Sequence, residues 1–149
     1  AIAMVLYEIC RVNHANFALV HFSSTTKVDF FSKDTVVEPR KLLDCAETLL
    51  GGGTDFEKPL REALALSADK RMERPDVVFI TDGMCDVSEE FLERFDEFKA
   101  DTGARLTGIL LDRGECFEFS LRRFADKVYR TSELEEDEIV ERTIHTFTR

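Results

Sequence analysis

Two short segments of the chain place oxygen ligands beside flexible backbone. The first is the glycine loop Gly51-Gly52-Gly53-Thr54-Asp55, in which the Thr54 hydroxyl follows three glycines. The second is Thr81-Asp82-Gly83, which directly follows the apolar run 77–80. Glycine allows backbone to approach a ligand closely. Hydroxyl and carboxylate oxygens suit a hard divalent cation, although two segments supply only a few of the roughly six oxygens that such an ion needs.

Each segment also has a simpler structural interpretation. Gly51 is a natural end for the preceding helix, and Thr54 or Asp55 is a suitable cap for the next one. Asp82 followed by glycine is equally a polar residue that starts a loop. The two segments are far more specific as an ordered pair than either is alone.

The elements that would position these segments alternate between strands and helices. Four consecutive apolar residues at 77–80 predict a strand that is covered on both faces. Two strands joined by the turn Ser23-Ser24-Thr25-Thr26 must run antiparallel. We predict strands at 17–22, 27–31, 77–81, 105–111 and 127–130, and helices at 1–12, 39–50, from 56, from 88, at 117–124 and after 132. This order predicts an α/β fold with a doubly wound, mainly parallel sheet, one antiparallel edge strand and helices on both faces.

Composition limits the classes of protein that fit. We predict a single domain over residues 1–149, which is long enough to bury a core. The net charge of −10 argues against nucleic acid and anionic membrane surfaces as partners, and no apolar stretch approaches the roughly 20 residues of a membrane span. Four scattered cysteines favour a reducing compartment, so we expect a cytoplasmic protein. Ser132 and Glu135 form a capping-box pattern that predicts the start of the last helix.

The order of the two segments resembles the von Willebrand factor type A (VWA) domain family. In that family a strand ending in Asp-x-Ser-x-Ser, a loop Thr and a later strand-end Asp form a metal-ion-dependent adhesion site (MIDAS). Residues 52–55 match the loop element and residues 79–83 match the later strand element. Within the family, the chain is most similar to the bacterial intracellular CoxE-like and ViaA-like proteins, which accompany MoxR-type AAA+ ATPases.

The resemblance has one gap, because Asp-x-Ser-x-Ser does not occur in this sequence. The family pattern implies that the helix at 1–12 directly follows this motif, so we expect an N-terminally truncated VWA-like domain whose first central strand is missing. The resemblance implies that Thr54 and Asp82 bind Mg²⁺ (or Mn²⁺), with Asp55 as a possible second-shell residue. It also implies that binding is weak or absent without the upstream motif.

Three functions remain open on this sequence. The resemblance favours a metal-dependent protein-interaction module that is not an enzyme, whose partner, an AAA+ ATPase among the candidates, supplies a Glu or Asp carboxylate to the metal. A second is a metal-assisted phosphoryl hydrolase that uses Asp82, although no second carboxylate or nearby histidine is evident as a base. A third is a structural domain that has lost its metal site.

Overall fold

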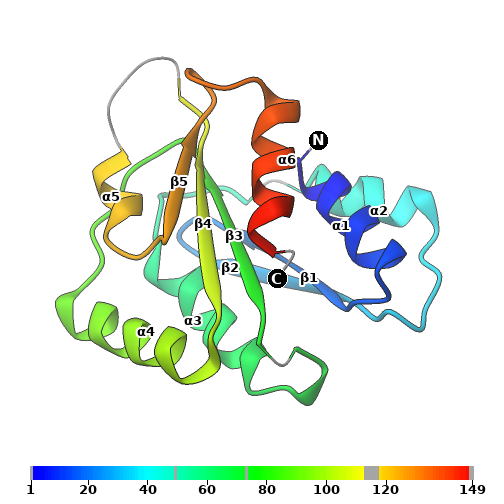
Figure 1. Cartoon of the computed structure of the whole chain (residues 1–149), viewed down its shortest axis with the longest axis horizontal. Helices are drawn as coiled ribbons and strands as arrows, with labels where there is room; N and C mark the ends of the chain where they lie inside the picture. The colour runs from blue at the N-terminus through cyan, green and yellow to red at the C-terminus, as the bar shows by residue number, and fades with distance from the viewer. Residues whose placement is uncertain (1, 49, 73, 113–117, 148–149) are drawn as a thin grey trace. The chain divides into compact units, whose positions relative to one another are not determined.

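A computed structural model describes residues 2–48, 50–72, 74–112 and 118–147. The chain forms two compact units, Ala1–Glu62 and Ala63–Arg149, and each is described separately below. The model has a mixed α/β architecture with one antiparallel and one parallel sheet, as Figure 1 shows. The predicted α/β class is confirmed at this level.

The first unit is built on a hairpin. It contains α1 (Ile2–Val12), β1 (Phe17–Phe22), β2 (Thr26–Phe31), α2 (Pro39–Ala46) and the start of α3 (Glu57–Ser67). The β1 and β2 strands pair antiparallel from Phe17 opposite Phe31 to Phe22 opposite Thr26. This confirms the predicted hairpin and the predicted helix at the start of the chain.

One face of the hairpin carries the core of the first unit. Residues two apart on a strand point to the same face, so Phe17 and Leu19 lie on the same side as Phe31. The buried Tyr7 of α1 packs edge-on against Phe17 and Phe31, with ring centroids 5.7 and 5.5 Å apart. Cys45 of α2 completes this cluster.

The α2 helix is shorter than predicted. Its apolar spacing predicts a helix through Leu50, but α2 ends at Ala46. The amide of Glu47 still donates to the Leu43 carbonyl, whereas the Thr48 side chain bonds back to the Asp44 carbonyl at 3.0 Å. The Thr48 hydroxyl thus satisfies a carbonyl that the next turn of helix would have used, and Gly51 is not the helix stop.

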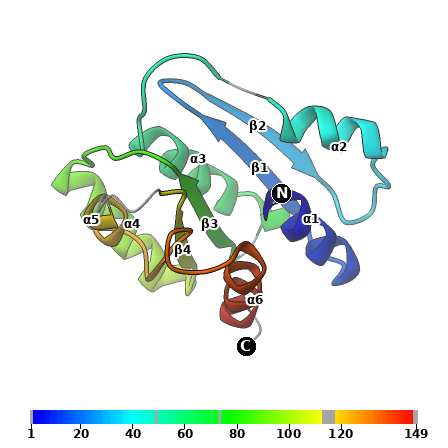
Figure 2. The same ribbon diagram turned by 90° about the horizontal axis from the view of Figure 1, so that it is seen from above.

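The second unit is built on a parallel sheet. It contains the short 3-10 helix η1 (Lys70–Met72), β3 (Asp76–Thr81), α4 (Glu89–Thr102), β4 (Arg105–Leu110), α5 (Glu118–Arg122), β5 (Lys127–Arg130) and α6 (Glu136–Phe147). The strand order is β3-β4-β5, and both pairings are parallel. Figures 1 and 2 show α4 and α5 on one face of this sheet and α6 on the other.

The α4 helix shows how sequence sets an element of this unit. The Ser88 side chain accepts a hydrogen bond from the Phe91 amide, and Gly103 ends the helix in the left-handed conformation at φ 70°. Phe91, Phe95 and Phe98 recur at helical spacing and are all buried, as predicted. Their burial fixes α4 against the sheet.

The predicted single sheet is present only in part. Among the described residues, β1 pairs with β2 alone and β3 pairs with β4 alone. Within the part of the chain that the structure describes, β1 and β3 therefore each have one hydrogen-bonded neighbour. The single domain over 1–149 and the doubly wound order stay predictions.

Candidate functional site

The glycine loop is held against the hairpin turn of the first unit. The Asp55 amide donates to the Ser23 carbonyl at 3.0 Å, and the Ser23 hydroxyl donates to the Gly51 carbonyl at 2.9 Å. Gly52 has φ +114°, and a Cβ at this position would clash with the Ser24 hydroxyl oxygen. Glycine is favoured at this position because the positive φ strains any L side chain and because a Cβ would displace the Ser24 hydroxyl.

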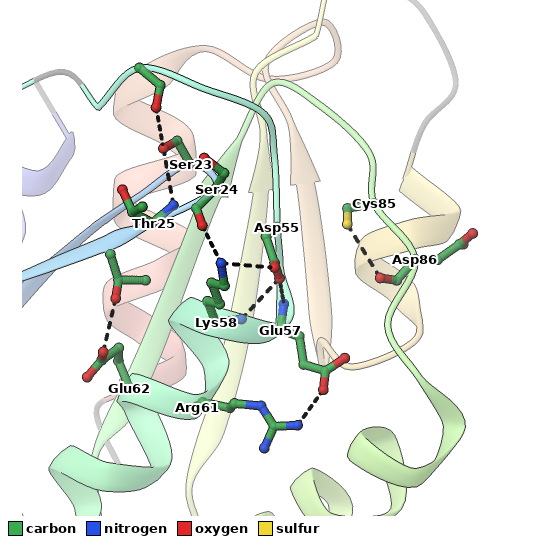
Figure 3. A network of polar contacts seen from close by, with 12 residues as sticks. Ser23, Ser24, Thr25, Asp55, Glu57, Lys58, Arg61, Glu62, Cys85 and Asp86 are labelled. Atoms are coloured by element: carbon green, nitrogen blue, oxygen red, sulfur yellow. Dashed lines mark hydrogen bonds and ion pairs between the residues drawn. The ribbon is translucent and has the colours of Figure 1, made fainter.

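Asp55 caps α3. Its Oδ1 accepts hydrogen bonds from the amides of Glu57 at 3.0 Å and Lys58 at 3.2 Å. The Lys58 ammonium lies 3.9 Å from Asp55 Oδ2 and donates to the Ser24 carbonyl, as Figure 3 shows. The capping interpretation is therefore confirmed for Asp55, and Lys58 provides a second connection between the helix start and the turn.

Thr54 lies beside this capping network but is itself exposed. Hydrogen bonds hold Gly51 and Asp55 to the turn on either side of it, so the backbone that carries the Thr54 hydroxyl is constrained. An exposed hydroxyl on a constrained loop can bind a cation or a partner without a large loss of conformational entropy.

Asp82 follows β3 at the carboxyl edge of the parallel sheet and is also exposed. The buried Thr81 accepts a hydrogen bond from the Gly83 amide on its hydroxyl at 3.2 Å and one from the Leu111 amide on its carbonyl at 2.8 Å. Thr81 thus anchors the turn, while Asp82 presents its carboxylate to solvent. This edge is where open α/β sheets bind ligands.

The structure brings together some of the predicted site residues. Thr54 and Asp55 share one loop in the first unit, whereas Asp82 belongs to the second unit. The proximity of Thr54 and Asp82 therefore stays a prediction. Among the described residues, no group of three or more His, Cys, Asp or Glu side chains is arranged to hold a metal ion. The donors available for Mg²⁺ are one hydroxyl and one carboxylate, which fit its preference for oxygen but form an incomplete set.

Sequence analysis missed a polar network at the same sheet edge as Asp82. Asp112 lies two residues past the end of β4, and its side chain is only 2% exposed. Its Oδ2 accepts from Nε of Arg130 at 2.8 Å and from the Ser132 hydroxyl at 3.0 Å, and its Oδ1 accepts from the Ser132 amide at 2.9 Å. A polar residue at the end of each of two neighbouring strands was the available signal.

Burial and hydrogen bonding have opposite effects on the pKa of Asp112. Burial alone would raise the pKa of Asp112, but hydrogen bonds from Ser132 and Arg130 outweigh it, so the pKa lies below its ordinary value. The predicted capping box is wrong. Ser132 lies four residues before the start of α6, and its hydroxyl donates to Asp112 instead of capping that helix. The network links the end of β5 to the end of β4.

The described cysteines, Cys10, Cys45 and Cys85, are all free. Burial raises the pKa of the Cys10 thiol and, together with the nearby Asp29 carboxylate, that of the Cys45 thiol. A raised pKa keeps these two sulfurs protonated at neutral pH and disfavours a nucleophilic role. Cys116 lies outside the described residues.

Comparisons with known proteins place the chain beside archaeal relatives. No protein-family model matches it. It is 35% identical over 126 residues to the uncharacterized protein MJ0077 of Methanocaldococcus jannaschii, which covers 85% of this chain and 30% of that protein. It is 25% identical over 140 residues to the uncharacterized protein MJ0811 of the same organism, which covers 93% of this chain and 31% of the relative. The chain thus spans about a third of these curated relatives.

A search of solved structures found an uncharacterized membrane spanning protein from Vibrio fischeri. The match covers 99% of this chain and 84% of the other, at 14% identity and a TM-score of 0.34. A TM-score this low supports no inference for this chain. Within residues 2–48, 50–72, 74–112 and 118–147, no helix has both the length and the apolar character of a membrane span.

Proposed function

We propose that the chain is a metal-ion-dependent protein-interaction module of the VWA type, with Thr54 and Asp82 as ligands of Mg²⁺ or Mn²⁺. The observation that carries the proposal is the position of Asp82, an exposed carboxylate just past a strand of a parallel sheet. Carboxyl edges of such sheets are the usual ligand sites of open α/β folds. The exposed Thr54 hydroxyl on a constrained loop is the second support.

The finer fold that we propose is a doubly wound sheet that lacks its first central strand. Helices cover both faces of β3-β4-β5 in the second unit, as a doubly wound arrangement requires. In the first unit, the antiparallel pairing of β2 with β1 supports the antiparallel edge strand of this proposed fold.

In this proposal the chain binds and does not catalyse. Thr54 and Asp82 would hold a small, hard cation, whose preference for oxygen would let a carboxylate of a protein partner complete its ligands. Asp55 contributes by capping α3 and fixing the loop beside Thr54. We propose a cytoplasmic protein partner, with a MoxR-type AAA+ ATPase as the leading candidate on the sequence resemblance.

Two other functions compete. A metal-assisted phosphoryl hydrolase would need a base near Asp82, and the buried Asp112 on the neighbouring strand end is already engaged by Arg130 and Ser132. A structural domain without a metal would leave Asp82 and Thr54 as ordinary surface residues. These alternatives differ from the proposal in where Mn²⁺ binds the chain and in whether the chain hydrolyses a phosphate ester.

Titration of the ¹⁵N-labelled chain with Mn²⁺ tests the proposal, because this paramagnetic ion broadens nearby amide signals even when binding is weak. We expect the signals around Thr54 and around Asp82 to broaden over the same Mn²⁺ range and to recover with excess Mg²⁺. Asp82→Ala should abolish the effect at both places. Asp86→Ala is the matched control, since it removes the same charge from an exposed position in the same loop.

The outcomes separate the three functions. Broadening at Asp82 without Thr54, or broadening that survives Asp82→Ala, would show that the two residues do not share an ion. Mg²⁺-dependent hydrolysis of p-nitrophenyl phosphate that is lost in Asp82→Ala but kept in Asp86→Ala would favour the hydrolase. No specific broadening anywhere would favour the structural domain.

A further inference from the structure

His21 and Asp29 form an unusual contact on the core-facing side of the hairpin. His21 Nε2 lies 3.4 Å from Asp29 Oδ2, and the two side chains are 10% and 21% exposed. Among the described residues, neither atom makes a hydrogen bond of normal length and angle. A buried imidazole without such a hydrogen bond is costly to charge, so protonation of His21 depends on whether this end of the hairpin is open to water.

The surroundings of the pair oppose a positive charge on His21. The Lys27 ammonium lies 3.4 Å from the same Asp29 oxygen. Burial of the imidazole lowers the pKa of His21, and Lys27 lowers it further, against the opposing effect of Asp29. Among the described residues, two titratable groups on β2 lie near His21, namely Asp29 and Lys27. Cys45 and Lys41 on α2 lie near Asp29, and Tyr7 of α1 belongs to the adjoining cluster.

The pair lies next to the turn that holds the glycine loop. His21 pairs with Lys27 in the hairpin, and only the pair Phe22 and Thr26 separates them from the turn. The turn residue Ser23 accepts from the Asp55 amide. Any loosening at His21 therefore acts directly on the part of the turn that binds the loop.

We propose that His21 and Asp29 form a proton-sensitive contact that keeps the turn at residues 23–25, and with it the glycine loop, closed near neutral pH and releases it in mild acid. A proton on His21 places an imidazolium beside Lys27 in a poorly hydrated position. Opening the end of the hairpin hydrates this charge. This proton-sensitive opening does not require a bound metal, so it can be tested independently of the proposed function.

The sign follows from proton linkage. The open state binds the proton at the ordinary His pKa of 6.5, whereas the closed state binds it at lower pH. Acid therefore favours opening below pH 6.5, by up to about tenfold in the opening equilibrium for each pH unit until the closed state also takes up the proton. Above pH 6.5 the equilibrium should not respond to pH through this residue.

Hydrogen exchange of the Asp55 amide measures this opening, since that amide bonds to Ser23. After correction for the intrinsic pH dependence of exchange, we expect its exchange to rise by up to about fivefold between pH 6.5 and 5.5. His21→Gln should remove this rise, and His145→Gln, which changes an exposed histidine on α6, should keep it. A flat profile in the wild type, or a rise that persists in His21→Gln, would overturn the proposal.

Direct titration of the His21 imidazole by NMR in the wild type keeps the proposal testable if His21→Gln does not fold. A midpoint below 6.5 supports the proposal, and a midpoint at or above 6.5 refutes it. Asp29→Asn should move the midpoint to still lower pH, because it removes the negative charge that favours the imidazolium.

Discussion

Replacement of Asp112 by Asn should destabilise the second unit more than any other single charge removal described above. The substitution keeps the shape of the side chain but removes its negative charge. It takes the buried counter-ion away from the Arg130 guanidinium, whose side chain is 11% exposed and which also pairs with the 62% exposed Glu133. It also replaces acceptor oxygens that now receive hydrogen bonds from Ser132.

The expected loss is about 3 kcal/mol in the free energy of unfolding. Removal of one partner from a buried ion pair costs roughly 3–5 kcal/mol, and we take the lower end because Asp112 lies at a strand end, at the edge of the sheet. Asp96→Asn is the matched control: Asp96 is 67% exposed and 3.7 Å from Lys99. Because Asp96 is exposed and Lys99 keeps its ion pair with Asp126, this substitution should cost less than about 1 kcal/mol.

Urea unfolding followed by far-UV circular dichroism measures both variants, with the midpoint compared at constant slope. The double variant Asp112→Asn with Arg130→Met should recover part of the loss, because it no longer leaves a buried cation from which the Asp112 carboxylate has been removed. A loss below about 1 kcal/mol for Asp112→Asn, or a double variant no more stable than the single one, would refute the reasoning, since either result shows that the pair is not effectively buried.

The same carboxylate predicts a pH dependence. Because the folded-state pKa of Asp112 lies below its ordinary value of 3.8, the stabilisation is fully present above that value and is lost as pH falls through the lower folded-state pKa. The difference in unfolding free energy between wild type and Asp112→Asn should therefore be constant from neutral pH to about pH 5 and shrink below 3.8.

Three further predictions concern other parts of the chain. Gly52→Ala should cost about 1–3 kcal/mol in unfolding free energy, because it forces a side chain into a positive-φ position against Ser24. Gly51→Ala is the control, since its Cβ would meet nothing within 4 Å, and its unfolding free energy should be close to that of the wild type. Equal losses of unfolding free energy in the two variants would contradict the special role of Gly52. Ser88→Ala should cost about 1 kcal/mol through loss of the α4 cap, and an unchanged urea midpoint would argue against that cap. Phe95→Ala should cost about 3–5 kcal/mol in unfolding free energy, since removal of this fully buried ring leaves a cavity between α4 and the sheet. A thermal unfolding midpoint near that of the wild type would instead show that neighbouring side chains fill the cavity.

Local sequence determined most of the helices and strands, because their signals lie within a few residues. The α4 helix is the clearest case: Ser88, the buried phenylalanines and Gly103 specify its start, its inner face and its end. The hairpin at 17–31 was equally predictable, since two apolar runs joined by a four-residue turn can only return antiparallel. The end of α2 was not, because the Thr48 side chain competes with the next turn of helix.

Sequence also identified which residues carry chemistry, but not the partner that each one meets. Asp55 and Asp82 are the same residue type, yet Asp55 caps α3 whereas Asp82 is exposed at the sheet edge. Asp112 drew no attention in the sequence and is the most enclosed of the three. Its partners lie 18 and 20 positions away.

The tertiary structure alone decided these roles, for a physical reason. A side chain bonds to whatever the strand register and the loop path bring within about 3 Å, and neither can be read from neighbours in the chain. The parallel pairing of β4 with β5 brings Arg130 and Ser132 to Asp112 and takes Ser132 away from α6. The antiparallel register of β1 and β2 likewise brings His21 within 3.4 Å of Asp29, eight positions further along the chain.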